Sequence, residues 1–219
     1  PALLADLEKA EKSIFLEFFI VSQGKMWQGV EDILRRKAAQ GVDVRLIYDD
    51  FGSLLGLPKD FVVRMERAHI RCIPFNPVVP LLSLVMNHRD HRKIVVIDGK
   101  VAYTGGINLA DEYINAITRF GYWKDSGVRL DGPGAASLAN IFLTFWKAKY
   151  PDEDLDPFQT QQLQEALQAQ EEALTALLPV LEAQTDWTRD AIFEACKTLA
   201  ESMEKKNGWL LFPLGIALS

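Results

Sequence analysis

The stretch from Asn87 to Asn108 most constrains what this chain can fold into. Its centre, Ile94 to Ile97, is continuously apolar, as expected of a strand that is buried on both faces. Asp98-Gly99 predicts a hairpin turn into a second strand. Alternate residues of a strand point to the same face, so His91 and Lys93 are predicted to project together at the start of the first strand. An imidazole beside an ammonium group suits the binding and attack of a phosphate.

His91 is the best candidate for a nucleophile in this stretch. A neutral imidazole can attack phosphorus and form a covalent intermediate, and its intrinsic pKa near neutrality supports that role. Lys93 would supply positive charge where charge spreads over the phosphate oxygens in the transition state. Asp98 completes the candidate catalytic set, and at the end of an apolar strand its carboxylate is expected to brace the turn.

Other residues are candidates for binding the substrate or its phosphate. Asn108 offers a neutral donor, and Gly105 and Gly106 would let the backbone approach the phosphate closely. Glu17 lies within an apolar strand, and Asp49-Asp50 directly follows another. Carboxylates at the carboxyl ends of parallel strands either face a ligand crevice, where they could bind part of a substrate, or accept hydrogen bonds from loop amides.

The order of predicted elements indicates an α/β fold. Strand and helix patterns alternate with short connections, which favours a layer of helices on a largely parallel sheet. Strands are expected at residues 14–21, 44–48, 70–75, 94–97, 101–104 and 128–130, and helices at 3–12, 27–40, 59–68 and 134–148.

Composition changes near the acidic, proline-bounded segment Pro151 to Pro157, which predicts a linker. We expect an α/β domain over residues 1–155 and a small all-helical module over 156–219. Residues 158–219 hold 4 Lys/Arg and 9 Asp/Glu, a net charge of −5, which leaves −1 of the total −6 for the rest. No signal peptide or membrane-spanning apolar run is visible, and a start at Pro1 predicts a piece of a longer protein.

The spaced set H-x-K-x4-D-x6-G-G-x-N from His91 to Asn108 resembles the signature of the phospholipase D superfamily. The pair H-x-K alone is more often a solvated strand start, but the whole set is specific. Over about residues 1–155 the chain is similar to the first catalytic half of bacterial cardiolipin synthases, which implies a layered α-β-α half. The segments that carry this similarity are Leu16 to Ile20, Gly41 to Arg45, Asp50 to Ser53, Phe75 to Pro77, Asn87 to Lys93, Trp123 to Asp125 and Val128 to Pro133.

The resemblance implies a phosphatidyltransferase that needs no metal or other cofactor. His91 would take a phosphatidyl group from phosphatidylglycerol and pass it to a second phosphatidylglycerol, which becomes cardiolipin. Asp125 stands where the superfamily places an acidic residue that orients the histidine. The implied location is the cytoplasmic face of the bacterial membrane, with this piece bound peripherally.

The sequence contains the motif once, whereas the superfamily site uses two. Neither His69 nor His88 has the spaced companions. The site would therefore need a second motif-bearing half or a homodimer, and a homodimeric phosphodiesterase or phospholipase is the alternative function.

The apolar run Val78 to Met86 directly precedes the catalytic strand. It could enter a bilayer surface and bring lipid to His91, or it could be a loop packed under the sheet. Replacing Leu82 and Leu84 with Ser should weaken liposome binding in the first case only.

The tail, about residues 160–219, resembles the anticodon-binding end of bacterial glutamyl-tRNA synthetase. The residues that carry this similarity are Leu178 to Leu181, Asp186 to Thr188, Ala191-Ile192, Lys206 to Gly208, Phe212 to Leu214 and Ile216 to Ser219, whereas Gly215 stands where that family typically has an Arg. It implies tRNA as a possible partner, and a tRNA-binding fragment as a further alternative function. The net charge of −5 favours a plain helical packing module instead, since positive charge supplies most affinity for nucleic acid.

Overall fold

The computed structural model describes residues 2–78, 88–119, 121–132, 134–152, 157–185 and 188–205. The chain divides into two compact units, Pro1–Asp154 and Leu155–Ser219. Most of the apolar run Val78 to Met86, and all of residues 206–219 of the tail, lie outside the described residues.

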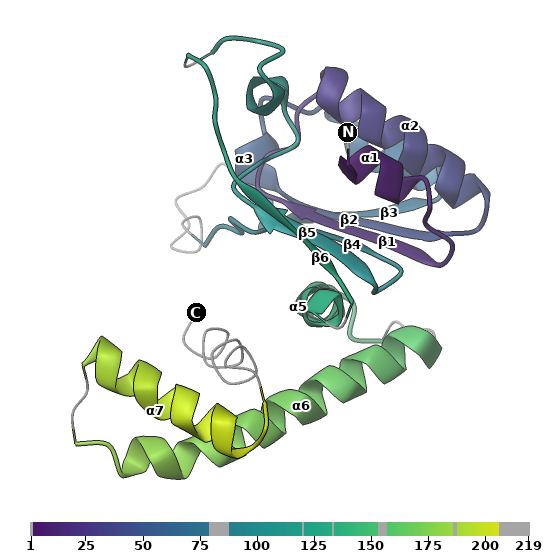
Figure 1. The fold of residues 1–219 in the computed structure, drawn as a ribbon. Helices are drawn as coiled ribbons and strands as arrows, with labels where there is room; N and C mark the ends of the chain where they lie inside the picture. The colour runs from purple at the N-terminus through teal and green to yellow at the C-terminus, as the bar shows by residue number, and fades with distance from the viewer. Residues whose placement is uncertain are drawn as a thin grey trace. The chain divides into compact units, whose positions relative to one another are not determined.

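The first unit is a layered α/β fold, as predicted (Figure 1). In chain order its elements are α1 (Ala2–Leu7), β1 (Ser13–Phe18), α2 (Lys25–Ala39), β2 (Asp43–Asp49), α3 (Asp50–Ser53), α4 (Phe61–Arg67), β3 (Ile70–Phe75), β4 (Lys93–Ile97), β5 (Val101–Gly105), the 3-10 helix η2 (Asp111–Ile114), β6 (Gly127–Asp131) and α5 (Gly134–Lys149).

The six strands form one sheet in the order β3-β2-β1-β4-β5-β6. β1 pairs with β2 and β2 with β3 in parallel, whereas β4 is antiparallel to both β1 and β5, and β5 is antiparallel to β6. The expectation of a largely parallel sheet was therefore wrong for half of it. β4 enters the sheet from the end at which β3 leaves it, so it must run in the opposite direction, and β5 and β6 then follow as antiparallel neighbours.

Helices cover both faces of the sheet (Figure 1). On one face, α1 and α2 pack with Ile14, Leu16 and Phe18 of β1 in a cluster of buried apolar residues. On the other face lies α5, where the ring of Phe142 stacks on Phe15 with 4.9 Å between centroids. Because β1 is the central strand and is buried on both faces, the end of β1 is a fixed point for the site.

The second unit contains α6 (Pro157–Glu182) and α7 (Arg189–Ser202). Their small core is formed by Ala173, Leu177, Cys196 and Ala200. The N-terminus of α7 is capped by Thr188, whose hydroxyl accepts a hydrogen bond from the Ala191 amide.

Candidate functional site

The site lies at the end of the sheet where β1, β2 and β3 finish and β4 begins (Figure 1). Register places Phe18, the last residue of β1, beside Lys93, the first residue of β4. Residues that leave β1 and β2 therefore meet the segment that leads into β4. This topology brings His91 next to Phe19, with 4.7 Å between ring centroids.

His91 and Lys93 are brought together as the alternation predicted. The His91 side chain is exposed, and Lys93 Nζ lies 3.0 Å from His91 Nδ1. Lys93 is only 5 % exposed, and its ammonium donates to the His91 carbonyl at 2.6 Å. Burial lowers the pKa of Lys93, while the carboxylates of Asp90 and Asp125 oppose that shift. An accessible imidazole thus lies against a desolvated cation.

The Lys93–His91 contact constrains which ring nitrogen can react. When the ammonium donates to Nδ1, the neutral ring carries its proton on Nε2, and Nε2 has no lone pair for attack. Attack by Nε2 needs the other tautomer, with the proton on Nδ1 and an acceptor facing it. A phosphate that draws the ammonium of Lys93 away from Nδ1 would permit this exchange.

Asn108 is buried and tied to the end of β1. Its Oδ1 accepts from the Ile20 amide at 2.9 Å, and its Nδ2 donates to the Tyr113 hydroxyl at 2.7 Å. The Leu109 amide also donates to the Ile20 carbonyl, which fixes this loop beside β1. The side-chain amide carries two N–H groups, so Asn108 has a second donor besides the one used by Tyr113.

Neither Gly105 nor Gly106 has space for a side chain, because residues 125–127 lie close to both. A Cβ on Gly105 would lie 2.4 Å from the Ser126 carbonyl oxygen, and one on Gly106 would lie 2.2 Å from Asp125 Oδ1. The Gly106 amide donates to that same carbonyl at 3.1 Å. The absence of side chains therefore lets the segment containing Asp125 approach the end of β5.

Asp125 is exposed and held by local contacts. Its Oδ1 accepts from the Ser126 amide at 2.8 Å, and its Oδ2 accepts from Trp123 Nε1 at 3.2 Å. Its charge acts on the pKa of Lys93, so it lies within electrostatic reach of the histidine–lysine pair. In this structure, however, the neighbour of His91 Nδ1 is Lys93.

Asp98 lies at the other end of β4 from His91, and its carboxylate binds the backbone. Oδ1 accepts from the amides of Lys12 at 2.7 Å and Ser13 at 2.8 Å, and Oδ2 accepts from the Glu11 amide at 2.9 Å. Its own backbone has a φ of 51°, a left-handed conformation that Asp and Asn tolerate. These contacts join the hairpin turn to the start of β1, which is the bracing role expected from the sequence.

Glu17 is fully buried on the α5 face of β1. Its Oε1 lies 2.6 Å from Nε of Arg92, which also pairs with Asp90 at 3.0 Å and lies 4.3 Å from the Phe145 ring centroid. Burial raises the pKa of Glu17 well above its usual range, and the charge of Asp90 adds to the rise. Glu17 therefore supports the segment that carries His91 from beneath.

Asp49 and Asp50 accept hydrogen bonds from loop amides, which was one of the two expected roles. The buried carboxylate of Asp49 accepts from the amides of Asp90 at 3.0 Å and Gly52 at 2.9 Å. Asp50 accepts from the Val78 amide at 2.7 Å. Both carboxylates thereby fix the two ends of the connection between β3 and β4.

Sequence reasoning missed Phe19, Tyr113 and Arg92 as members of the site. Phe19 and Arg92 are each within two residues of a named candidate, so proximity was a usable signal for both. Tyr113 lies on η2, a 3-10 helix of four residues that is too short for a periodic sequence pattern to predict. Within the described ranges, no three His, Cys, Asp or Glu side chains are grouped so that they could hold a metal ion.

Comparison with known proteins shows the family to which the first unit belongs. The family described as "Cardiolipin synthase, PLD-like domain" matches residues 3–129, and the family described as "Anticodon binding domain" matches residues 135–219. The second description names no particular synthetase, so the assignment of the tail to glutamyl-tRNA synthetase is not supported. The matched range also includes α5, whose Phe142 packs on β1 of the first unit.

Two curated relatives and one solved structure illustrate the similarity. An uncharacterized protein of Streptococcus mutans is 50 % identical over 159 residues, which is 73 % of this chain and 34 % of the relative. A cardiolipin synthase of Geobacillus kaustophilus is 42 % identical over 146 residues, 66 % of this chain and 29 % of the relative. The crystal structure of phosphatidylserine synthase from Haemophilus influenzae superposes with a TM-score of 0.50 at 14 % identity, over 79 % of this chain and 40 % of that one. The chain thus spans about a third of the length of these curated relatives.

Proposed function

Because this chain belongs to the PLD-like family of cardiolipin synthases, we propose that it is one catalytic half of a phosphatidyltransferase that acts through a phosphohistidine. The observation that carries the proposal is the exposed imidazole of His91 with Lys93 Nζ 3.0 Å from its Nδ1. The family match supports an enzyme of the phospholipase D type. The donor, the acceptor and the covalent intermediate are the proposed parts.

In the first step, His91 Nε2 attacks the phosphorus of phosphatidylglycerol. A P–N bond forms, the bond from phosphorus to the glycerol oxygen breaks, and glycerol leaves with a proton from a general acid. In the second step, a hydroxyl of another phosphatidylglycerol attacks phosphorus and gives its proton to that same group. The P–N bond breaks, cardiolipin forms and His91 is restored. Lys93, with the second N–H of Asn108, is the candidate donor to the phosphate oxygens in both steps.

The general acid is proposed to come from a second copy of the motif. The sequence contains the motif once, and the curated relatives are about three times as long as the matched region. A missing half or a second copy of this chain would each supply another histidine facing the same phosphate. With a second copy, water could replace the lipid hydroxyl in the second step, which gives the phosphodiesterase or phospholipase alternative.

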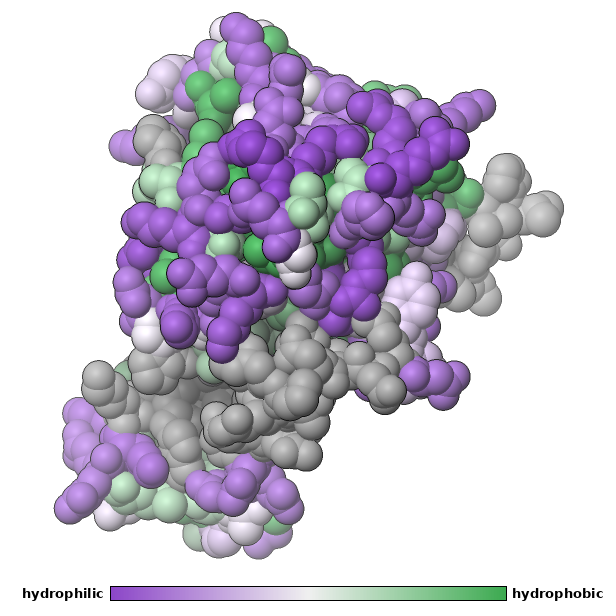
Figure 2. All heavy atoms as spheres, turned by 90° about the vertical axis from the view of Figure 1, so that its right-hand side faces the viewer, coloured by the Kyte–Doolittle hydropathy of each residue, from purple (hydrophilic) through white to green (hydrophobic). Residues whose placement is uncertain are grey.

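The distribution of apolar side chains supports contact with a membrane surface. Phe51 of α3 and the following Leu54 and Leu55 are 52 %, 51 % and 96 % exposed, at the end of the sheet that carries His91. The opposite end of the first unit presents mainly hydrophilic side chains (Figure 2). A rim of exposed apolar residues beside the site is the feature expected of a protein that draws lipid from a bilayer.

The backbone beneath this apolar rim is firmly held. The Ser53 hydroxyl accepts from the Val21 amide at 3.0 Å and donates to the Phe19 carbonyl at 3.3 Å. A Cβ on Gly52 would lie 2.3 Å from that carbonyl oxygen, so the turn approaches β1 closely. No helix among the described residues has both the length and the apolar character needed to cross a bilayer. We infer peripheral binding at the membrane face on which phosphatidylglycerol is consumed, which for the implied bacterial enzyme is the cytoplasmic one.

The test is cardiolipin formation measured together with molar mass in solution. The chain is incubated with phosphatidylglycerol vesicles, alone and with the remaining half of a relative, and His91→Asn is the control. Cardiolipin that requires the added half and His91 supports the proposal. A dimer that yields only phosphatidic acid would favour the phosphodiesterase alternative, and turnover that survives His91→Asn would exclude both.

The tail is proposed to be a helical packing module. Its described helices meet through Ala173, Leu177, Cys196 and Ala200, and its net charge of −5 over residues 158–219 opposes nucleic acid. Salt-sensitive binding of tRNA to the chain, lost when residues 157–219 are removed, would establish the RNA-binding alternative instead.

A further inference from the structure

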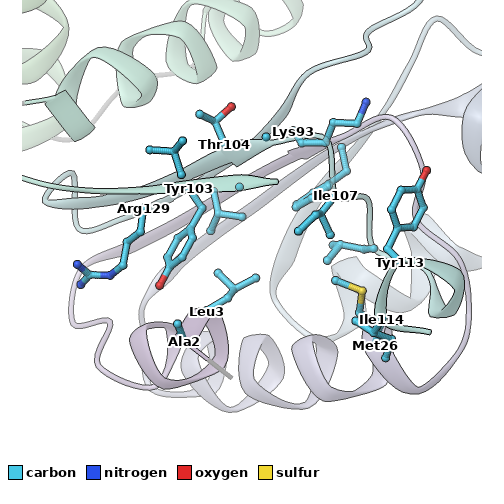
Figure 3. Close-up of a pocket in the computed structure, with 16 residues that line it drawn as sticks. Ala2, Leu3, Met26, Lys93, Tyr103, Thr104, Ile107, Tyr113, Ile114 and Arg129 are labelled. Atoms are coloured by element: carbon cyan, nitrogen blue, oxygen red, sulfur yellow. The ribbon is translucent and has the colours of Figure 1, made fainter. Parts of the chain in front are cut away.

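A cavity of about 470 Å³ lies behind Lys93, on the sheet face that α1 and α2 cover (Figure 3). Its walls are mainly apolar: Leu3, Phe18, Met26, Val95, Ile107 and Ile114. Lys93 lines one end of it, and Arg129 lines the other. This volume is within the range of pockets that hold small ligands.

The charged groups at the Arg129 end are paired with one another. Arg129 Nε donates to Asp6 at 2.7 Å, and the Tyr103 hydroxyl donates to the same carboxylate at 2.5 Å. Arg129 Nη1 donates to Asp131 at 3.0 Å. Two carboxylates therefore balance the charge of Arg129, which leaves this end with little attraction for an anionic group, and an occupant would be held mainly by apolar contact.

The Lys93 end has the opposite character. In Figure 3, the ammonium of Lys93 and the hydroxyl of Tyr113 point to the same side, away from the apolar side chains of Leu3 and Met26. Lys93 Nζ lies 3.0 Å from His91 Nδ1, and the Tyr113 hydroxyl accepts from Asn108. The cavity thus has a polar mouth at the candidate phosphate site and an apolar interior.

The wall formed by η2 is anchored and also open to one side. The Asp111 carboxylate accepts from the amides of Lys25 at 3.0 Å and Met26 at 2.8 Å, which ties η2 to the first turn of α2. Ile114 and Val128, on the open side, are 47 % and 53 % exposed. A long flexible group can therefore enter from the side without the wall moving.

From this arrangement we propose that the cavity binds one fatty acyl chain of the phospholipid whose phosphate is held at His91 and Lys93. The proposal rests on the proposed function and names how the lipid is held. The polar mouth suits the phosphate of a phospholipid, and the apolar interior suits the hydrocarbon tail of the same molecule. The cavity would then favour long-chain over short-chain donors, by about fourfold in affinity for each further methylene that is buried.

The experiment uses phosphatidylglycerol with a photoactivatable diazirine near the end of one acyl chain, mixed into phosphatidylglycerol vesicles. After illumination, adducts on the chain are located by mass spectrometry. We expect adducts on Leu3, Met26 or Ile114. Adducts confined to other surfaces, or none, would overturn the proposal. Adducts in the cavity that disappear when the chain pairs with a second copy would also overturn it, because the partner would then cover the cavity.

Two variants and a control make the result specific. Ile114→Trp narrows the open side and should reduce adducts at Leu3 and Met26 by about tenfold. Ile114→Asp places a carboxylate at the same position and should lower the adduct yield to the same extent without added bulk. Both Ile114 variants should fold, because the side chain is 47 % exposed. Val63→Trp, at a position on α4 that is 45 % exposed, should leave the adduct yield unchanged. Equal yields in all three variants would contradict the proposal.

His91→Ala separates this proposal from the proposed function. If the variant keeps the adducts and the unaltered chain never forms a phosphohistidine, the acyl site stands and the phosphatidyltransferase fails. If the phosphohistidine forms and the adducts lie outside the cavity, the acyl site fails and the enzyme stands.

Discussion

Replacing Asp98 with Asn tests whether this residue of the motif acts on structure or on chemistry. The carboxylate accepts three backbone hydrogen bonds at 2.7–2.9 Å, from Glu11, Lys12 and Ser13. Asparagine keeps one acceptor oxygen and tolerates the φ of 51°, so the variant changes the hydrogen bonds and leaves the backbone preference alone. We expect a less stable first unit whose site is intact.

The magnitude follows from the three contacts. The asparagine oxygen can keep the two hydrogen bonds that Oδ1 makes to Lys12 and Ser13, but these lose the charge, at about 0.5 kcal/mol each in this part-exposed place. The nitrogen that replaces Oδ2 cannot accept from Glu11, which costs about 1 kcal/mol. The sum is about 2 kcal/mol, or a fall of roughly 4–8 °C in Tm for a unit of this size.

The assay pairs urea unfolding, followed by circular dichroism, with phosphohistidine labelling at a temperature where the variant is folded. Asp60→Asn is the matched control, because Asp60 is exposed and makes no side-chain cap to α4, and it should change stability by less than about 0.5 kcal/mol. Unchanged stability of Asp98→Asn together with lost labelling would refute the structural reading of Asp98.

Four further outcomes are expected. Asp125→Asn should leave stability within about 0.5 kcal/mol but slow phosphoenzyme formation at least about tenfold in a rapid-quench burst, because in the proposed reactive tautomer the Asp125 carboxylate would accept the Nδ1 proton of His91. Burial lowers the pKa of Lys93, so the rate of phosphoenzyme formation should decrease as the pH rises, at a pH below about 10.4, the pKa of an ordinary lysine. Lys93→Arg should react more slowly, but its rate should not show this decrease, because arginine stays charged. Burial raises the pKa of Glu17, so the folded chain holds a proton that the unfolded chain releases above about pH 4.3. The free energy of unfolding should then fall with rising pH by up to about 1.4 kcal/mol per unit until the folded pKa is passed, and Glu17→Gln should remove this slope in urea titrations. Replacing Leu54 and Leu55 with Ser should weaken sedimentation with anionic vesicles by about tenfold per leucine without lowering Tm.

Each of these expectations can fail on its own. An unchanged burst in Asp125→Asn would remove the orienting role of that carboxylate. If the rate of Lys93→Arg still decreases at alkaline pH, the decrease is caused by the titration of another group. A pH slope of stability shared by Glu17→Gln and the unaltered chain would mean that the buried carboxyl does not titrate differently on folding. Full vesicle binding by the double leucine variant would place the membrane contact elsewhere.

The pairing of His91 with Lys93 was predictable because both residues belong to one short segment. Alternation along a strand and the rigidity of a buried apolar run fix their relative directions before any tertiary contact is known. Similarly, Asp98 could be assigned to bracing because it ends the run at a turn, although the partners at Glu11 to Ser13 are more than eighty residues away. Local geometry was enough in both cases.

The partners of Glu17 and Asp98, and the order of the strands, depend on the tertiary fold. Nothing in the local pattern shows that β4 lies beside β1 and runs against it, so the sheet could be mistaken for a largely parallel one. The pairing of Glu17 with Arg92 follows from that neighbour relation, and so does the cavity behind Lys93. Likewise η2 has too few residues for a periodic signal, yet it supplies Tyr113 and Ile114 to this region.

The most direct test of the central claim is the chemical identity of the covalent intermediate. The chain, with a second half added, is mixed with phosphatidylglycerol labelled in its phosphatidyl group, quenched within milliseconds and digested for mass spectrometry. The account predicts an acid-labile, base-stable phosphatidyl adduct on His91 that is absent from His91→Asn. Active protein in which the label is carried by another residue, or by none, would contradict it.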